Sequence, residues 1–182
     1  MKNLRNLRPI HIPMSQPGTS KVFIEPMIAS HLEAVMSIDR RSYLVPWHAS
    51  AYITELNNRA ATYLVALAGE EIVAYGGIWV IMDEGHITTL AVDPIHRGKH
   101  FGEQVLLALL DEAITRSATH ITLEVRQHNE AARALYAKYR FRPRGVRRGY
   151  YTDNGEDAVV MWVEDIDKPE YRAFLIEQRS RL

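Results

Sequence analysis

The 182-residue chain contains no cysteine. Disulfide bonds, thiolate nucleophiles and zinc sites built on cysteine are therefore excluded. The chain also lacks an excess of either charge, because 22 lysines and arginines balance 22 aspartates and glutamates. No overall field marks it as a nucleic-acid or membrane binder. It has no apolar stretch that resembles a signal-peptide core or a membrane span, and we expect a cytoplasmic protein that binds no membrane and no nucleic acid stably.

Several catalytic signatures are missing as well. The eight histidines are scattered and include no HExxH pattern, so we expect no metal site. The absence of a GxSxG pattern leaves hydrolase triads without support. Neither the dinucleotide pattern GxGxxG nor the phosphate loop GxxxxGK followed by Ser or Thr occurs. Any phosphate that the chain binds therefore belongs to another kind of ligand.

The length and an apolar content of 47% are typical of one domain with a core of ordinary size. Residues 1–21 carry several cations, three prolines and no acid, and we expect them to form a flexible N-terminal extension. The domain itself is predicted over residues 22–165, with a C-terminal helical tail over residues 166–182.

Hydrophobic periodicity predicts strands at residues 22–27, 62–67, 71–81, 86–92, 121–125, 141–150 and 158–162, and helices at 30–41, 49–57, 101–116, 129–139 and 168–182. Ser30 and Glu33 predict a capping box at the first helix. The helix between the fourth and fifth strands requires a crossover, and hence a parallel pair in an otherwise antiparallel sheet. The order predicts an α/β (α+β) fold, a mixed and mostly antiparallel sheet of about seven strands flanked by about four helices. We expect a cleft between the parallel fourth and fifth strands.

The segment from Leu90 to Ala113 joins an apolar strand to a strongly periodic helix through a basic, glycine-containing loop. Unpaired N–H groups and the positive end of the helix dipole would attract a phosphate to that helix N-terminus. An ordinary strand-to-helix connection explains the same pattern, and local physics leaves both interpretations open. The loop consists of Arg97, Gly98, Lys99, His100, Phe101 and Gly102.

Three polar side chains follow this segment. Glu124 is either the polar-face residue of an alternating strand or a general base whose pKa is raised by partial burial. Tyr136, on the next helix, is either a core aromatic or a proton donor to a leaving thiolate. Asn129 is either the cap of that helix or a ligand for peptide-like groups.

A cluster of arginines with interleaved aromatic residues comes next. Such a cluster can bind RNA, but the alternation is more typical of the solvated face of a strand, and the neutral total charge favours that interpretation. The cluster consists of Arg140, Arg142, Arg144, Arg147 and Arg148.

Together these features resemble the GCN5-related N-acetyltransferase (GNAT) family, and within it the RimI-type enzymes that acetylate the N-terminal alanine of a small-subunit ribosomal protein. The resemblance spans about residues 23–165. The loop pattern alone is typical of the superfamily, whereas the motifs around Glu124, Tyr136 and Tyr151 are more specific. The residues that carry the resemblance are Pro46-Trp47, the segment 87–94, Leu123 to Arg126, Asn129, Ala134 to Tyr136, Gly145 to Tyr151, and Asn154 to Ala158 with Met161.

The resemblance implies the GNAT fold and acetyl coenzyme A (acetyl-CoA) as cosubstrate. It also implies that Glu124 is the base, Tyr136 the acid and Asn129 a contact of the pantetheine arm. Backbone groups of Leu90, Ala91 and Val92 would bind the acetyl-pantetheine arm. The pyrophosphate would lie on Arg97, Gly98, Lys99, His100, Phe101, Gly102 and Glu103. His100 stands where the family pattern has glycine, so a positive φ at this residue would bear on cofactor affinity.

The implied acceptor is a protein or peptide N-terminus, most directly that of a ribosomal protein. Other N-termini, lysines and small amines remain open as acceptors, and so does a noncatalytic acyl-CoA-binding module. Acceptor choice is expected to depend on residues 43–49 and 147–152. We expect a monomer or a weak dimer.

Overall fold

The computed structural model describes residues 22–182. The predicted N-terminal extension over residues 1–21 lies outside the described residues. The described chain forms seven strands and five α-helices. The strands are β1 (Phe23–Pro26), β2 (Ala61–Ala68), β3 (Glu71–Ile81), β4 (Glu84–Val92), β5 (His120–Arg126), β6 (Arg142–Tyr151) and β7 (Glu156–Glu164). The helices are α1 (Leu32–Ser42), α2 (Ala49–Leu56), α3 (Phe101–Thr115), α4 (Glu130–Lys138) and α5 (Pro169–Arg179).

The strands form one sheet in the order β1-β2-β3-β4-β5-β7-β6. Short turns make β2, β3 and β4 antiparallel neighbours. Helix α3 returns the chain to the level of Glu84 at the start of β4, where β5 begins at His120, so β5 pairs with β4 in parallel. The hairpin of β6 and β7 adds to β5 through β7, which leaves β6 as an edge strand. The predicted mixed, mostly antiparallel fold with one parallel pair is confirmed.

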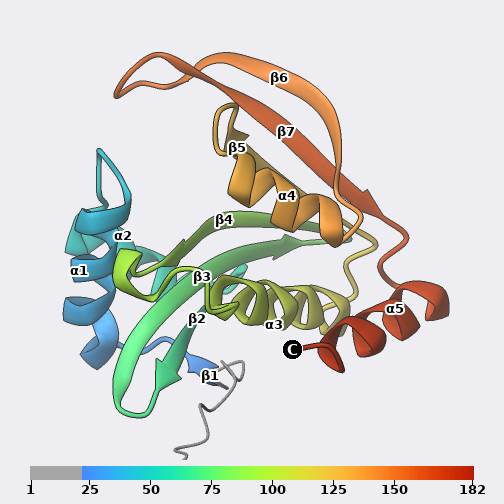
Figure 1. The fold of residues 1–182 in the computed structure, drawn as a ribbon, viewed down its shortest axis with the longest axis horizontal. Helices are drawn as coiled ribbons and strands as arrows, with labels where there is room; N and C mark the ends of the chain where they lie inside the picture. Colours follow the sequence, from blue (N-terminus) through green and yellow to red (C-terminus); the bar gives the residue numbers. More distant parts are fainter. Residues whose placement is uncertain (1–21) are drawn as a thin grey trace, which may run out of the picture.

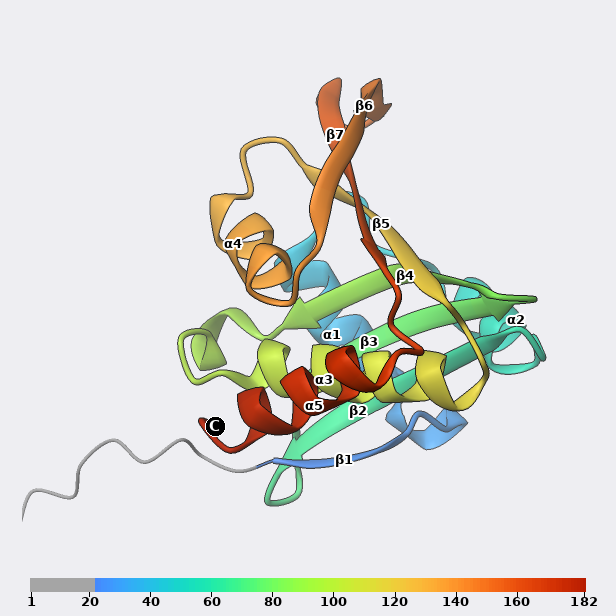
Figure 2. The ribbon, with the colours of Figure 1, turned by 90° about the vertical axis from the view of Figure 1, so that its right-hand side faces the viewer.

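The helices cover both faces of the sheet because side chains alternate along each strand. Val65 and Tyr75 pack with α1 and α2, whereas their neighbours Ala66 and Ala74 pack with α3 on the other face. Figure 2 shows α3 and α5 on one side of the sheet and α1 with α2 on the other. The β6–β7 hairpin arches over β5 and α4 at one end of the molecule (Figure 1).

The parallel pairing of β4 and β5 stops early. It runs from Glu84 opposite His120 to Ile87 opposite Leu123, and no further pair follows. On the other edge of β4, the register with β3 shifts between Gly77 opposite Thr89 and Ile78 opposite Ile87, so Thr88 is an extra residue, a β-bulge. Because a bulge bends its strand, β4 leaves β5 where the sequence predicts a cleft.

A tyrosine holds the bulge in place. The hydroxyl of Tyr63 on β2 lies 3.1 Å from the hydroxyl of Thr88. Its ring lies over Gly77, where an added Cβ would come within 2.4 Å of the ring atoms. Gly77 therefore lets the Tyr63 ring cross β3 to reach Thr88.

The start of α1 differs from the prediction. Ser30 does not cap the helix, because a short 3₁₀ turn over Ala29–His31 precedes it. The N–H of Ile28 donates to Nδ1 of His31 (3.3 Å). A local side chain thus satisfies the backbone before a Ser30–Glu33 capping box can form, and that prediction is wrong.

The predicted helical tail packs against the domain. Tyr171 and Leu175 of α5 are buried in the core that α3 contributes to. The hydroxyl of Tyr171 donates to the carbonyl of Tyr139 (3.0 Å), and Arg179 forms an ion pair with Asp111 of α3. Helix α5 therefore braces both α3 and the end of α4.

We predict that Gly77→Ala lowers the free energy of unfolding by about 1–3 kcal/mol, because the new methyl group forces the Tyr63 ring away from Thr88. Gly145→Ala is the matched control, since a Cβ at Gly145 meets no atom within 4 Å. Urea unfolding of both variants measures the difference. Equal stability of the two variants would contradict the packing described here.

Candidate active site at the separated strand ends

The open edge of β4 presents backbone groups beyond the bulge. The N–H of Asp93 donates to Val73 on β3 (2.9 Å), so by alternation Leu90 and Val92 direct their backbone groups away from β3. Ala91, which was also expected to bind the acetyl-pantetheine arm, lies opposite Tyr75 and by the same alternation directs its backbone groups toward β3. The carbonyl of Leu90 accepts a hydrogen bond from the Tyr43 hydroxyl (3.1 Å). No strand pairs with this edge after Ile87 in the described chain. Its N–H groups are therefore available to a ligand.

The loop after β4 ends at the N-terminus of α3. The first backbone bond of this helix runs from Gln104 N–H to the carbonyl of His100 (3.0 Å), which leaves the N–H groups of residues 101–103 without a helical partner. Gly98 has φ +77°. A Cβ at Gly102 would meet Val92 at 2.9 Å, so glycine lets the helix start close to the end of β4. Arg97 and Lys99 add two exposed cations.

His100 caps α3 in the left-handed conformation, with φ +61°. This is the backbone region that favours glycine, and a histidine there carries a conformational cost. Its Nδ1 lies 2.9 Å from the carboxylate of Glu103. The departure from the family pattern is therefore at a backbone position that calls for glycine.

Glu103 has a side chain that points into the protein. It is buried, accepts a hydrogen bond from the Tyr139 hydroxyl (2.7 Å) and forms an ion pair with Lys138. The carboxylate therefore ties α3 to α4. What Glu103 can offer a ligand is its backbone N–H.

Glu124 lies one residue past the last position at which β5 pairs with β4. Its side chain is 11% exposed, and both oxygens have partners. His86 Nε2 on β4 lies 3.2 Å from Oε2, and Arg147 Nη1 on β6 donates to Oε1 (2.7 Å). Two strands distant in the sequence thus meet at one carboxylate.

The electrostatics of Glu124 differ from the prediction. Partial burial was expected to raise its pKa, but the hydrogen bond with His86, followed by the one from Arg147, outweighs burial and lowers the pKa below the ordinary value of 4.5. The expectation is wrong because the sequence does not show which side chains of other strands reach this residue. Glu124 is an ionised carboxylate at neutral pH.

Tyr136 is buried in the core and packs against Phe141 (ring centroids 5.8 Å apart). Burial raises the pKa of its hydroxyl, and the nearby hydroxyls of Tyr43 and Tyr151 act in the same direction. A phenol from α4 thus lies near phenols from the end of α1 and from β6. Tyr136 is both a core aromatic and a protonated hydroxyl at neutral pH.

Asn129 is the cap of α4. Its side-chain oxygen accepts a hydrogen bond from Ala132 N–H (3.1 Å), the more common of the two roles considered. The amide NH₂ group is not used in this cap.

Arg126 anchors the β6–β7 hairpin to the end of β5, a role that the sequence did not reveal. Its guanidinium pairs with Asp153 and with Glu156 (3.2 Å) and lies 3.9 Å from the centre of the Tyr151 ring. The hydrogen bond from His128 N–H, with others from Arg126 and His128, lowers the pKa of Glu156 to about 2. These contacts orient the hairpin beside Glu124.

The arginines of the basic cluster are on or beside the exposed strand β6 and have separate environments. Arg140 lies 4.0 Å from the Phe174 ring of α5, Arg144 pairs with Glu164, and Arg147 pairs with Glu124. Arg142 and Arg148 are exposed. Three of the five arginines therefore contact other side chains of the domain, and one of these three, Arg147, contacts Glu124.

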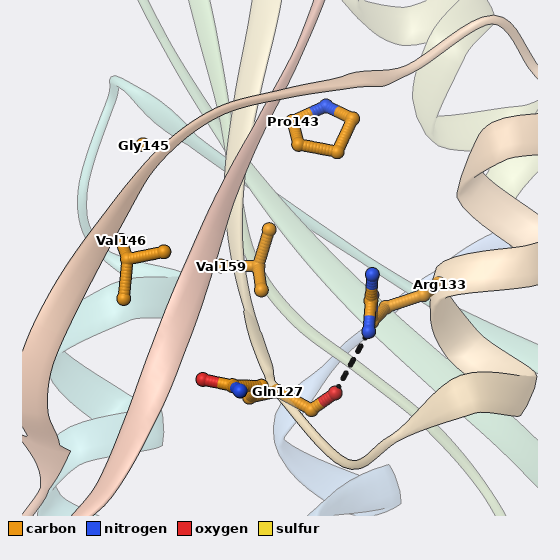
Figure 3. A pocket seen from close by; sticks show the side chains of 6 residues that line it. All are labelled: Gln127, Arg133, Pro143, Gly145, Val146 and Val159. Atoms are coloured by element: carbon orange, nitrogen blue, oxygen red, sulfur yellow. Dashed lines mark hydrogen bonds between the residues drawn. The ribbon is translucent and has the colours of Figure 1, made fainter.

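A surface hollow of about 340 Å³, whose lining does not include Glu124, lies between α4 and the β6–β7 hairpin. Figure 3 shows Arg133 of α4 on one side, with its guanidinium directed to the carbonyl of Gln127 (2.9 Å), and Pro143, Gly145 and Val146 of β6 on the other. Apart from Arg133, its lining is uncharged.

Residues 22–182 contain no group of three His, Asp or Glu side chains placed to hold a metal ion. No helix in the same range has the length and apolar character needed to cross a bilayer.

We predict that the Glu124 carboxyl titrates below pH 4.5, and that its midpoint rises in Arg147→Gln and rises further in His86→Ala, because His86 is the stronger influence. A lowered folded-state pKa contributes stability that is complete above the unfolded value and is lost as the pH falls through the folded value. Carboxyl ¹³C NMR measures the midpoints, with Arg142→Gln as control. A wild-type midpoint above 4.5 would contradict the assigned partners.

Comparison with known proteins shows the family of the chain. The model of the acetyltransferase (GNAT) family matches residues 32–141. A putative ribosomal protein bS18-alanine N-acetyltransferase of Bacillus subtilis is 37% identical over 145 residues, 79% of this chain and 96% of that protein. The ribosomal protein bS18-alanine N-acetyltransferase of Escherichia coli K12 is 31% identical over 140 residues, 76% of this chain and 94% of that protein.

A crystal structure of the ribosomal-protein-S18-alanine N-acetyltransferase from Escherichia coli has a TM-score of 0.73 and 28% identity, and the alignment covers 80% of this chain and 94% of that one. Enzymes of this family use acetyl-CoA as the acetyl donor. The chain therefore belongs to the GNAT acetyltransferase family, is similar to its RimI-type members, and is an acetyl-CoA-dependent N-acetyltransferase.

Proposed function

We propose that the protein transfers an acetyl group from acetyl-CoA to the α-amino group of a protein N-terminus, specifically the N-terminal alanine of a small-subunit ribosomal protein. The observation that carries the proposal is the ionised carboxylate of Glu124 at the point where β4 and β5 separate. The names of the relatives from Bacillus subtilis and Escherichia coli support the choice of acceptor. Such an acceptor would place the enzyme in the cytoplasm.

The residues after β4 fit the donor. Leu90 and Val92 would offer backbone N–H groups to the pantetheine arm, and the amide of Asn129 would contact it from α4. The unpaired N–H groups of residues 101–103, with Arg97 and Lys99, would hold the pyrophosphate. Positive φ at Gly98 and His100, and the close approach at Gly102, expose this backbone. The bound donor supplies an activated acetyl thioester.

Glu124 is suited to the proton that the acceptor must lose. An α-amino group has a pKa near 8 and is mostly protonated at neutral pH. The ionised carboxylate attracts the ammonium and then accepts its proton, directly or through a water molecule. His86 holds the other oxygen and orients the carboxylate between β4 and β5.

Two further groups complete the proposed chemistry. The N–H groups at the open edge of β4 would donate to the oxygen that gains negative charge during transfer. Tyr136 keeps its proton at neutral pH because burial raises its pKa, so it can donate that proton to the departing sulfur. Tyr43 covers the carbonyl of Leu90 and leaves the N–H groups free.

Glu124→Gln is expected to reduce turnover by about 10²- to 10⁴-fold, the usual effect of removing a general base. The amide keeps the shape of the side chain, so the dissociation constant of CoA should stay within about twofold. Thiol release with an alanine-starting peptide measures turnover, and calorimetry measures CoA binding. Near-normal turnover would exclude Glu124 as the base.

Tyr136→Phe removes a hydroxyl while the ring keeps its contact with Phe141. We expect an unchanged melting temperature and a lower turnover, because no acid remains for the departing thiolate. Leu135→Met, on the same helix, is the control for packing effects. Full activity of Tyr136→Phe would exclude Tyr136 as the acid.

A peptide panel decides between acceptors. Peptides that differ in their first two residues are incubated with acetyl-CoA, and mass spectrometry locates the acetyl group. Alanine-starting peptides modified at the α-amine support the proposal, whereas modification of lysine or of small amines points to another acceptor class. CoA binding without turnover on any amine would indicate a noncatalytic acyl-CoA-binding module.

A further inference from the structure

Both oxygens of the Glu124 carboxylate already have a partner in the structure. His86 occupies Oε2 of the carboxylate at 3.2 Å, and Arg147 occupies Oε1 at 2.7 Å. With 11% of the side chain exposed, there is little room for an additional partner. An acceptor amine can reach the carboxylate once one of these two groups has left.

His86 is the more firmly held of the two partners. Its Nδ1 lies 2.8 Å from the hydroxyl of Thr122, which is its register partner on β5. Both ring nitrogens of His86 therefore contact side chains of β5, Nδ1 at Thr122 and Nε2 at Glu124. His86 is also less exposed than Arg147, with 31% of its side chain accessible against 56%.

Arg147 is on a strand with room to move. Residues 142–150 of β6 are exposed, and residues 148–150 form an irregular stretch opposite Asp157 alone. The hollow of about 340 Å³ lies under Pro143, Gly145 and Val146 (Figure 3), so this part of β6 is not packed onto a core. In the same conformation the guanidinium lies 4.3 Å from the centre of the exposed Tyr150 ring, a contact at the surface that does not depend on Glu124.

We propose that Arg147 is a specificity-determining residue that occupies the place of the acceptor's ammonium on Glu124 and is displaced by that ammonium. This inference rests on the proposed function and states how the acceptor amine gains access to the Glu124 carboxylate. Guanidinium and ammonium are both cationic hydrogen-bond donors, so one can replace the other on the same carboxylate oxygen. A neutral or blocked N-terminus cannot balance the negative charge of the Glu124 carboxylate, so it does not displace Arg147. The ion pair thereby selects for a charged primary amine.

Calorimetry tests the exchange in the presence of CoA, which has no acetyl group to transfer. An alanine-starting peptide and its Nα-acetylated form are titrated into wild type, Arg147→Gln and the control Arg142→Gln, which loses the same charge from the same strand. We expect Arg147→Gln to bind the free-amine peptide about three- to tenfold more tightly, because no ion pair has to break. Arg142→Gln should match wild type, and the acetylated peptide should show no gain. Unchanged or weaker binding of the free amine by Arg147→Gln overturns the proposal.

Arginine side-chain NMR separates this proposal from the identity of the ribosomal acceptor. Butylammonium is the probe. It should shift the Arg147 resonance in wild type and leave the spectrum of Glu124→Gln unchanged. Tetramethylammonium, which cannot donate a hydrogen bond, should have no effect on either protein. Displacement by butylammonium without acetylation of any peptide would overturn the proposed acceptor and support the role of Arg147. Peptide acetylation with an unmoved Arg147 resonance would support the function and overturn the role of Arg147.

Discussion

The early end of the β4–β5 pairing is the constraint on which the site depends. Thr88, an extra residue held by the Tyr63 hydroxyl, bends β4 away after Ile87. A parallel pair would otherwise satisfy the backbone groups of Leu90 and Val92 internally. The release of these backbone groups beside Glu124 follows from this one irregularity. The N-terminus of α3 begins close to the end of β4, and we propose that the donor binds to both.

Glu124 combines a lowered pKa with a proposed role as a base, and the two are linked. A carboxylate held by His86 and Arg147 is always ionised at neutral pH but is a weak proton acceptor. A guanidinium does not give up its proton in a protein, whereas an ammonium with a pKa near 8 can. When the acceptor's ammonium replaces Arg147, binding therefore brings to the carboxylate the proton that it would accept. The irregular, exposed strand β6 permits this exchange at little cost to the core.

The sequence predicts the elements well because their signals are local. The apolar spacing of α3 and the short turns around β3 are sufficient to place seven strands and the one parallel crossover. Local sequence patterns do not predict the lowered pKa of Glu124. Its partners His86 and Arg147 are distant from it along the chain, Arg147 by 23 residues, and the register between β6 and β7 determines that Arg147 reaches it. Likewise, the inward turn of Glu103 depends on Lys138 and Tyr139, which tertiary packing brings to it.

If acetyl-CoA binds to the backbone that the bulge frees, CoA should protect that backbone from solvent. Amide hydrogen exchange of the whole protein with and without CoA measures this protection. We expect slower exchange at Leu90, Val92 and residues 98–103, with no change along the outer edge of β6. Protection confined to other parts of the sheet, with residues 90–103 unchanged, would contradict it.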